Sequence, residues 1–328
     1  MAPVRAAIVQ RPPALLHRDE TIARVLDGLE EAAAAGAGLV VFPETYVPGY
    51  PEYVWRLTPG GDYDLSREIH GRLLENAVDL EADDLRPVRE AAARHGATVL
   101  LGVHERDSAF SRASLFNTLV TIGPDGAILN RHRKLVPTNP ERMVWAPGDA
   151  SGLRVLDLPF GRLGGLICWE NYMPLARYSL YAQGIEIYVA STWDQGDGWL
   201  ASMRHIAREG RCWVLGAGCS IQARDVPADF PDRERLYQDP DEWLNGGDSV
   251  IVDPLGHVVA GPQHEEHGLL VADIDASASR AAHYTLDAAG HYNRPDIFSL
   301  RVNRSPARQV VFDDGPGLSA GADDTLEV

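Results

Sequence analysis

Three residues whose side chains can carry out covalent and acid–base chemistry stand at positions that the fold alone does not explain. Glu44 follows an apolar run that is typical of a buried strand, and Cys168 ends a second such run. Lys134 lies in the segment 130–138, in which four of nine residues are potentially cationic, in an otherwise acidic protein. A thiol, a carboxylate and an ammonium group can act as nucleophile, general base and stabiliser of developing negative charge. The pattern therefore predicts a site for nucleophilic catalysis at three strand ends.

Each of these residues also has an ordinary structural interpretation. A glutamate is commonly a solvated loop acid, a basic run commonly faces solvent, and a buried cysteine is commonly inert. The last interpretation fits Cys212 and Cys219, which lie in one apolar stretch. Cys168 differs because polar residues follow it, and we expect the N-terminus of the next helix, with an inward lysine, to favour its thiolate.

A cysteine–histidine pair is the competing arrangement, but the sequence carries no local protease, GxSxG or phosphate-loop signature.

The elements that must position these residues alternate along both halves of the chain. Strands are predicted at residues 4–9, 39–42, 98–103, 185–190, 212–217 and 268–274. Hairpins are predicted to join 117–122 to 127–131, 153–158 to 164–167, and 249–252 to 257–259, with 268–274 continuing the third. Helices are predicted from the cap Asp19 to Gly36, near 83–95, and at 174–183 and 199–209.

This rhythm predicts an α/β protein. We expect two sheets packed face to face with helices outside, a four-layer α-β-β-α sandwich in a single domain. The domain is expected to cover residues 1–304. Residues 305–328, rich in Gly, Pro, Asp and Ser, are expected to form a mobile tail.

Composition and charge exclude several classes of partner. The 328 residues include 47 acidic and 30 basic ones, and the net charge of −17 argues against general binding of nucleic acid or anionic membranes. No apolar run reaches the length of about 20 residues that spans a bilayer. The first ten residues do not resemble a signal peptide, and three cysteines without zinc-ligand spacing fit a reducing compartment. We therefore expect a cytoplasmic protein with no nucleic-acid or membrane partner and no metal.

The segments that carry the three residues resemble the signature segments of the nitrilase, or carbon–nitrogen hydrolase, superfamily. In the family's order and with similar spacing, they are Phe42-Pro43-Glu44, His132-Arg133-Lys134-Leu135 and Ile167-Cys168-Trp169-Glu170-Asn171. The resemblance covers residues 4–303. Residues 136–145, 168–175 and 290–296 are similar to the nitrilase branch, whereas amidase branches usually carry a different residue pair after the cysteine.

The resemblance implies an enzyme that hydrolyses a nitrile to the carboxylic acid and ammonia, with thioimidate and thioester intermediates on Cys168. It makes Glu44 the general base, and it assigns to Lys134 and the Trp169 backbone N–H the stabilisation of charge on the substrate nitrogen. Glu141 matches a second glutamate of the family, which would position Lys134 or water. The resemblance also implies a homo-oligomer, a dimer or larger, whose partners are a small-molecule nitrile and water, with no cofactor.

The substrate pocket is predicted from position alone. Tyr50, Trp55, Thr192 and Trp193 follow or flank the signature segments, and His291 lies in the C-terminal motif. Ordinary core or rim packing is the alternative for each of them. Aromatic walls suit aliphatic or arylaliphatic groups, and the sequence does not choose between these.

Two other functions stay open at this point. The first is an amidase or carbamoylase of the same superfamily, which ammonia release from nitriles against the matching amides would separate. The second is a non-catalytic member that binds a partner. It is disfavoured because Glu44, Lys134 and Cys168 are all present.

Overall fold

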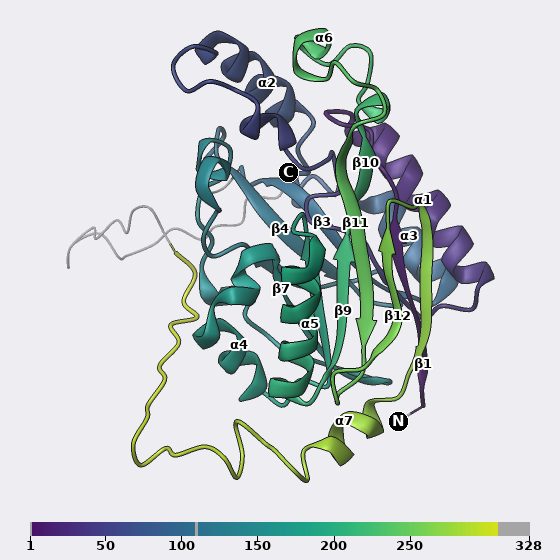
Figure 1. The fold of residues 1–328 in the computed structure, drawn as a ribbon, viewed down its shortest axis with the longest axis vertical. Coiled ribbons are helices and arrows are strands. Elements are labelled where there is room, and N and C mark those ends of the chain that lie inside the picture. The colour runs from purple at the N-terminus through teal and green to yellow at the C-terminus, as the bar shows by residue number, and fades with distance from the viewer. Residues whose placement is uncertain (1, 109–110, 308–328) are drawn as a thin grey trace, which may run out of the picture.

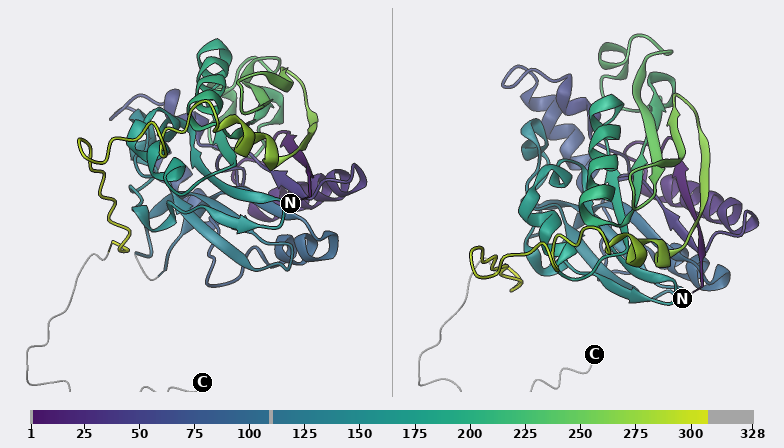
Figure 2. Two further views of the ribbon diagram at one scale, coloured as in Figure 1. Left: turned by 90° about the horizontal axis from the view of Figure 1, so that it is seen from below. Right: turned by 60° about the horizontal axis from the view of Figure 1, so that its bottom comes forward.

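Two β-sheets packed face to face form the centre of the protein, as the computed structural model shows for residues 2–108 and 111–307 (Figure 1). Helices lie on the two outer sides, so the layers follow the order helix, sheet, sheet, helix (Figure 2). The predicted α/β class and four-layer sandwich are therefore confirmed. Residues 308–328 of the predicted tail lie outside the described residues, and the domain boundary at 304 stays a prediction.

The first sheet has parallel strands at its centre and antiparallel strands at its sides. In spatial order its strands are β13 (Gly268–Ile274), β1 (Val4–Gln10), β2 (Leu39–Val41), β3 (Thr98–Arg106), β4 (Leu115–Ile122) and β5 (Ile128–Arg133). β1, β2 and β3 are parallel, whereas β13, β4 and β5 each run antiparallel to the strand they join. β5 therefore runs in the same direction as β2.

The second sheet repeats this plan. In spatial order its strands are β10 (Ser220–Gln222), β11 (Trp243–Val252), β9 (Trp213–Gly218), β8 (Ile187–Thr192), β7 (Gly161–Ile167) and β6 (Leu156–Leu158), and β12 (Val258–His264) also pairs with β11. β7, β8 and β9 are parallel and the other pairings are antiparallel. The three predicted hairpins correspond to β4–β5, β6–β7 and β11–β12 and are confirmed.

The helices divide between the two outer faces (Figures 1 and 2). The first sheet is covered by α1 (Arg18–Ala34) and α3 (Arg86–His95), and the second by α4 (Pro174–Tyr181) and α5 (Gly196–Gly210). The other α-helices among the described residues are α2 (Tyr63–Glu75), α6 (Arg233–Leu236) and α7 (Ala276–Ala282). Short 3₁₀ helices are η1 (Glu52–Trp55), η2 (Asn139–Met143), η3 (Ala150–Gly152), η4 (Cys168–Tyr172) and η5 (Ala223–Asp225). Within the described ranges, no helix combines the length and hydropathy that crossing a membrane requires.

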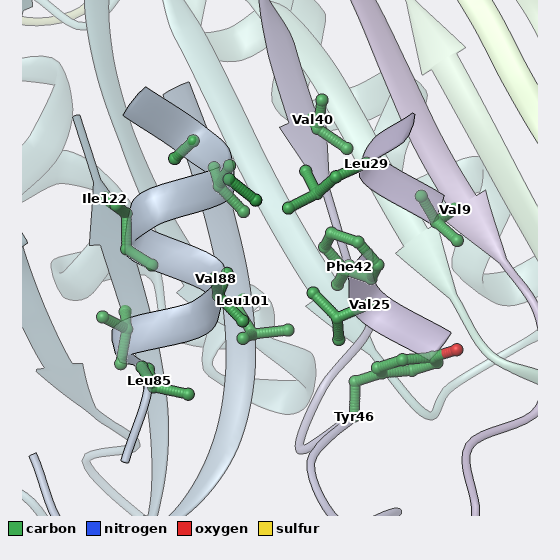
Figure 3. Close-up of a cluster of buried hydrophobic side chains, with 14 of the residues drawn as sticks. Val9, Val25, Leu29, Val40, Phe42, Tyr46, Leu85, Val88, Leu101 and Ile122 are labelled. Atoms are coloured by element: carbon green, nitrogen blue, oxygen red, sulfur yellow. The ribbon is translucent and has the colours of Figure 1, made fainter. Parts of the chain in front are cut away.

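Successive side chains of the central strands face different layers. In β1, Val9 packs beneath α1 whereas Ile8 packs between the sheets. Figure 3 shows the outer cluster, where Val25 and Leu29 of α1 and Val88 of α3 meet side chains of the first sheet. Because both faces are covered, these strands have continuous apolar sequences.

Two predictions about these elements are wrong. Asp19 does not cap α1: His17 is the N-cap residue, and the Asp19 carboxylate lies within the first turn and accepts a hydrogen bond from Arg18 Nε. The strand 268–274 does not continue the third hairpin, because it crosses to the first sheet and pairs antiparallel with β1. Without it β1, which is almost wholly buried, would be an edge strand with unpaired backbone groups.

Candidate active site

The ends of four strands bring the predicted catalytic residues to one edge of the sandwich. Glu44 follows β2 and Lys134 follows β5, both in the first sheet. In the second sheet, Cys168 follows β7, and Thr192 is the last residue of β8. Parallel strands end at the same edge of a sheet, which is where α/β proteins bind their ligands. The site therefore lies where the two sheets meet.

The Glu44 carboxylate is buried and is held from both sheets. Lys134 Nζ donates to Glu44 Oε1 over 2.7 Å, and Asn117 Nδ2 of β4 donates to the same oxygen over 2.7 Å. The Trp193 backbone N–H, just after β8, donates to Glu44 Oε2 over 2.8 Å. These donors fix the orientation of the carboxylate before any substrate binds.

Glu141 is a second buried carboxylate on the same lysine. Lys134 Nζ donates to Glu141 Oε2 over 2.8 Å, and the Thr138 N–H donates to that oxygen over 2.6 Å. The Tyr50 hydroxyl donates to Glu141 Oε1 over 2.6 Å. Lys134 is thus held between two carboxylates, which is the geometry that the predicted supporting role of Glu141 requires.

Cys168 lies at a sharp turn beside these groups. Its φ of 50° is in the left-handed region, which is uncommon for a residue other than glycine. Asn171 Nδ2 donates to the Cys168 carbonyl over 2.7 Å, and the Tyr188 hydroxyl donates to Asn171 Oδ1 over 2.7 Å, so the turn is braced from β8. Cys168 Sγ and carboxylate oxygens of Glu44 and Glu141 all lie within 4.8 Å of one another.

The electrostatics of the cluster correct one prediction. Burial raises the pKa of the Cys168 thiol, the charge of Glu44 adds to this, and Lys134 only partly opposes it. The expectation that the resting site favours a thiolate is therefore wrong, because two carboxylates and one ammonium face a buried thiol. Burial also raises the pKa of Glu44, against the opposing charge of Lys134. For Lys134, burial acts to lower the pKa, but the facing negative charges outweigh it, so the pKa is raised and the ammonium stays charged.

A cation-binding interpretation of the cluster meets a physical obstacle. The spacing of the Glu44, Glu141 and Cys168 ligand atoms would suit a metal ion. However, the Lys134 ammonium already lies between the two carboxylates, within hydrogen-bond distance of both. The lysine thus supplies the positive charge that a metal would bring.

Glu170 ties the nucleophile to the lysine, and the sequence interpretation gave it no role. Its Oε2 accepts the N–H of Ile167, the residue before Cys168, over 2.7 Å. Its Oε1 accepts the N–H of Leu135, the residue after Lys134, over 2.6 Å, and His132 Nε2 lies 2.9 Å from Oε2. Its place two residues after the cysteine in a signature segment was the available signal. Asn117 carried no comparable signal, because it lies within an apolar strand.

The predicted pocket residues fall into two groups. Tyr50 stacks on Trp193, with ring centroids 4.4 Å apart and planes 7° from parallel, so both lie beside the carboxylates that they bind. The Thr192 side chain acts to lower the pKa of the Cys168 thiol, and its hydroxyl accepts the Asp194 N–H. The structure brings these three residues to the cluster.

The other pocket candidates lie farther out. Trp55, at the end of η1, is half exposed, and His291 is exposed after α7, where its ring packs on Tyr292. Neither takes part in the hydrogen-bond network that joins Glu44, Lys134 and Glu141 in the described residues. The Trp169 side chain is also half exposed, while its backbone N–H lies in the first turn of η4, where helical N–H groups lack helical partners.

Known proteins resemble this chain in sequence and in fold. A family model described as carbon–nitrogen hydrolase matches residues 5–284. The chain is 39% identical over 317 residues to an aliphatic nitrilase of Sinorhizobium fredii. The matched region covers 95% of this chain and 99% of that protein. It is 42% identical over 283 residues to a nitrilase of Bradyrhizobium diazoefficiens, with 86% of each covered. The crystal structure of a carbon–nitrogen hydrolase from Helicobacter pylori matches the fold with a TM-score of 0.68 at 19% identity, covering 90% of this chain and 97% of that one.

Proposed function

Because the chain belongs to the carbon–nitrogen hydrolase family, in its nitrilase branch, we propose that it hydrolyses an organic nitrile to the carboxylic acid and ammonia. The observation that carries this proposal is the buried arrangement of Glu44, Lys134 and Glu141 beside Cys168. This arrangement supports the proposal because a thiol, a carboxylate and an ammonium group that lie this close together could act on one substrate carbon as nucleophile, base and fixed positive charge.

The first half of the reaction builds a covalent intermediate. Glu44 accepts the thiol proton while Cys168 Sγ bonds to the nitrile carbon, and the proton then passes to the nitrile nitrogen. The product is a neutral thioimidate. Because burial raises the pKa of both the thiol and the Glu44 carboxyl, transfer between them is better matched than with an ordinary glutamate. Lys134 and the Trp169 N–H would stabilise the charge that develops on nitrogen.

The second half consumes two waters. Glu44 takes a proton from the first water as its oxygen adds to the thioimidate carbon, and the proton moves to nitrogen. The carbon–nitrogen bond then breaks, ammonia leaves with the hydroxyl proton, and a thioester remains on Cys168. A second water adds in the same way, the carbon–sulfur bond breaks, and the thiolate regains its proton as the acid leaves. Glu141 holds Lys134 in place throughout.

The substrate's organic group would lie against the wall made by Tyr50, Thr192 and Trp193. Tyr50 hydrogen-bonds Glu141 and the Trp193 backbone hydrogen-bonds Glu44, so this wall is held against the reacting groups. An apolar aromatic wall suits aliphatic or arylaliphatic nitriles.

Ammonia release from a panel of aliphatic, arylaliphatic and aromatic nitriles, run beside the matching amides, tests the proposal. We expect ammonia and acid from at least one nitrile, and none when Cys168→Ala replaces the wild type. Cys212→Ala is the matched control, because Cys212 is equally buried but lies behind the second sheet, away from the cluster. Turnover of amides alone would point to an amidase or carbamoylase instead. Near-normal turnover by Cys168→Ala would overturn the nucleophile assignment.

We also propose that the protein acts in the cytoplasm as a homo-oligomer, a dimer or larger. The family resemblance supports the assembly, and the three free cysteines support a reducing compartment. Light scattering on the eluting peak of a sizing column would show a mass of at least twice 35.8 kDa. A monomer under assay conditions would contradict this part of the proposal.

A further inference from the structure

Two half-exposed aromatic side chains next to the nucleophile share one acceptor. Trp169 and Tyr172, here called the aromatic rim, both belong to η4, which begins at Cys168. Trp169 Nε1 donates to Asp194 Oδ2 over 3.0 Å, and the Tyr172 hydroxyl donates to the same oxygen over 2.8 Å. Their rings meet edge to face with centroids 6.0 Å apart. A single carboxylate thus fixes the orientation of both rings.

Asp194 itself stands on an anchored turn. Its own N–H donates to Thr192 Oγ1 over 2.8 Å, and the preceding N–H, of Trp193, donates to Glu44. Two residues further on, the Gly196 N–H donates to Asp248 Oδ2 over 2.7 Å. Because the backbone on both sides is held, the Asp194 carboxylate is a fixed point to which the rim is attached.

The rim also lies close to the reacting thiol. Trp169 is bonded directly to Cys168, and the side chain of Thr192, which accepts the Asp194 N–H, acts to lower the pKa of the Cys168 thiol. Cys168 is buried whereas both rim side chains are nearly half exposed, so the rim connects the turn of the buried thiol to the protein surface. Burial raises the pKa of Tyr172 to about 12, with a contact to Ser202 opposing it and the hydrogen bond to Asp194 adding to it, so the Tyr172 hydroxyl remains a donor at assay pH.

We propose that Asp194 is a positioning residue that holds the aromatic rim in one arrangement over the approach to Cys168 and thereby limits the width of the molecules that reach the thiol. For the substrate range this rests on the nitrile hydrolysis proposed above, and it predicts selection against branched or bulky groups next to the nitrile carbon. For access to the thiol it needs no assumption about the reaction. Charge-assisted hydrogen bonds of this kind are stronger than neutral ones, so removing their acceptor frees both rings.

The first measurement uses size-graded thiol reagents. The wild type, Asp194→Ala and Asp194→Asn are treated with iodoacetamide or N-phenylmaleimide, and labelling of Cys168 is followed by mass spectrometry of its peptide. The quantity compared is the labelling ratio, the rate at which N-phenylmaleimide labels Cys168 divided by the rate for iodoacetamide. Asp194→Ala should raise this labelling ratio about tenfold, the factor that corresponds to losing one charge-assisted hydrogen bond. Asp194→Asn keeps an acceptor oxygen and should stay closer to the wild type.

Controls separate rim opening from a general loosening of the fold. Asp197→Ala makes the same charge change three residues further on, at an exposed position in the first turn of α5, and should leave the ratio unchanged. Labelling of the buried Cys212 and Cys219 should also stay unchanged. If Asp194→Ala does not fold, Tyr172→Phe removes one donor of the pair and should shift the ratio in the same direction by a smaller factor.

The second measurement is kcat/KM across nitriles of increasing width. Asp194→Ala should raise the value for branched or arylaliphatic nitriles relative to the smallest nitrile, mainly through KM, with little change in kcat for the smallest. If nitriles are hydrolysed and Asp194→Ala shifts neither the labelling ratio nor the kcat/KM of wide nitriles relative to the smallest one, the rim proposal is wrong. If no variant hydrolyses a nitrile but the labelling ratio shifts, the rim proposal stands and the proposed function fails.

Discussion

Lys134 shows how narrowly the chemistry of one residue can be specified. The sequence has 30 lysine and arginine residues, and Lys134 is the only lysine among them. Every other such position carries the larger guanidinium of arginine, whereas position 134 carries a compact ammonium. Its Nζ is buried and bonds two carboxylates that are themselves fixed. A guanidinium is larger and planar, and directs its donors differently.

We therefore expect Lys134→Arg to be nearly as damaging as Lys134→Ala. The expected result is a loss of kcat/KM of the same order in both variants, measured on any accepted nitrile, because charge alone does not restore the contact geometry. Circular dichroism of both variants would check that they fold. A kcat/KM for Lys134→Arg within a few fold of the wild type would exclude direct contact of Lys134 with the reacting atoms.

The Glu44 carboxyl should set the acidic limb of the pH profile. Burial raises its pKa, and below that pKa the group is protonated and cannot accept the thiol proton. As the pH falls, kcat/KM should therefore decline with an apparent midpoint above the ordinary glutamate value of about 4.3. The buried His104 is not the cause, because burial lowers its pKa to about 3 and it remains neutral across this range. A profile that stays flat down to the ordinary carboxylate range would contradict the assignment.

At the scale of elements, the turn that carries Glu44 rests directly on β3. A Cβ added at Gly102 would meet the Pro43 carbonyl oxygen at 2.2 Å and the Thr45 nitrogen at 2.4 Å. Both are backbone atoms on either side of Glu44, so they can give way only if the turn moves. The absence of a side chain at Gly102 therefore lets β3 support the base.

Gly102→Ala should accordingly reduce kcat by more than tenfold, since a displacement of about 1 Å of a catalytic group can cost a hundredfold. Overpacking should also lower the free energy of unfolding by about 1–3 kcal/mol, measured by denaturant titration. Gly71→Ala is the matched control: it lies in α2 with no heavy atom near the added Cβ, and should keep activity with equal or higher stability. Normal kcat in Gly102→Ala would mean that the Glu44 turn is not held by β3.

The sequence predicted most of the strands, including the buried β2 and the largely exposed β12. The runs before Glu44 and Cys168 are apolar because both faces of β2 and β7 are covered, so their ends could be located from residue types alone. α2 was missed because only Ile69 and Leu73 of its residues are fully buried, which leaves little periodic signal. The partner of β13 depends on closure between distant segments, which no local pattern contains.

The candidate site was predictable in its reacting groups and not in their charge state. The thiol pKa depends on how many carboxylates face Cys168 and how deeply it is buried, and these follow only from the packed structure. The same holds for Asn117 and Asp194, whose roles arise from hydrogen bonds to residues 73 and 25 positions away in the sequence. Spacing along the chain carries no trace of such contacts.

At the scale of the whole molecule, the site exists only where the two sheets are docked. The Ser191 hydroxyl of β8 donates to the Phe42 carbonyl over 3.0 Å, which joins the second sheet to the chain just before Glu44. The Trp193 N–H makes the next connection, to Glu44 itself. Catalytic geometry and the apolar layer between the sheets are therefore linked, but the layer extends well beyond the site.

A substitution deep in that layer should separate stability from catalysis. Ile187 is fully buried between the sheets at the start of β8, and Thr192 at the other end is five residues away, about 16 Å along a strand. Ile187→Ala should lower the free energy of unfolding by about 2–5 kcal/mol, because it removes buried methyl groups and leaves a cavity. Below the unfolding transition, kcat/KM should stay within a few fold of the wild type, since the strand end and its hydrogen bonds are unchanged.

Ile128→Ala, at an exposed position on β5, is the control and should change neither the unfolding free energy nor kcat/KM appreciably. A loss of kcat/KM above tenfold in Ile187→Ala, with little change in unfolding free energy, would show that the intersheet layer positions the catalytic groups over its whole length.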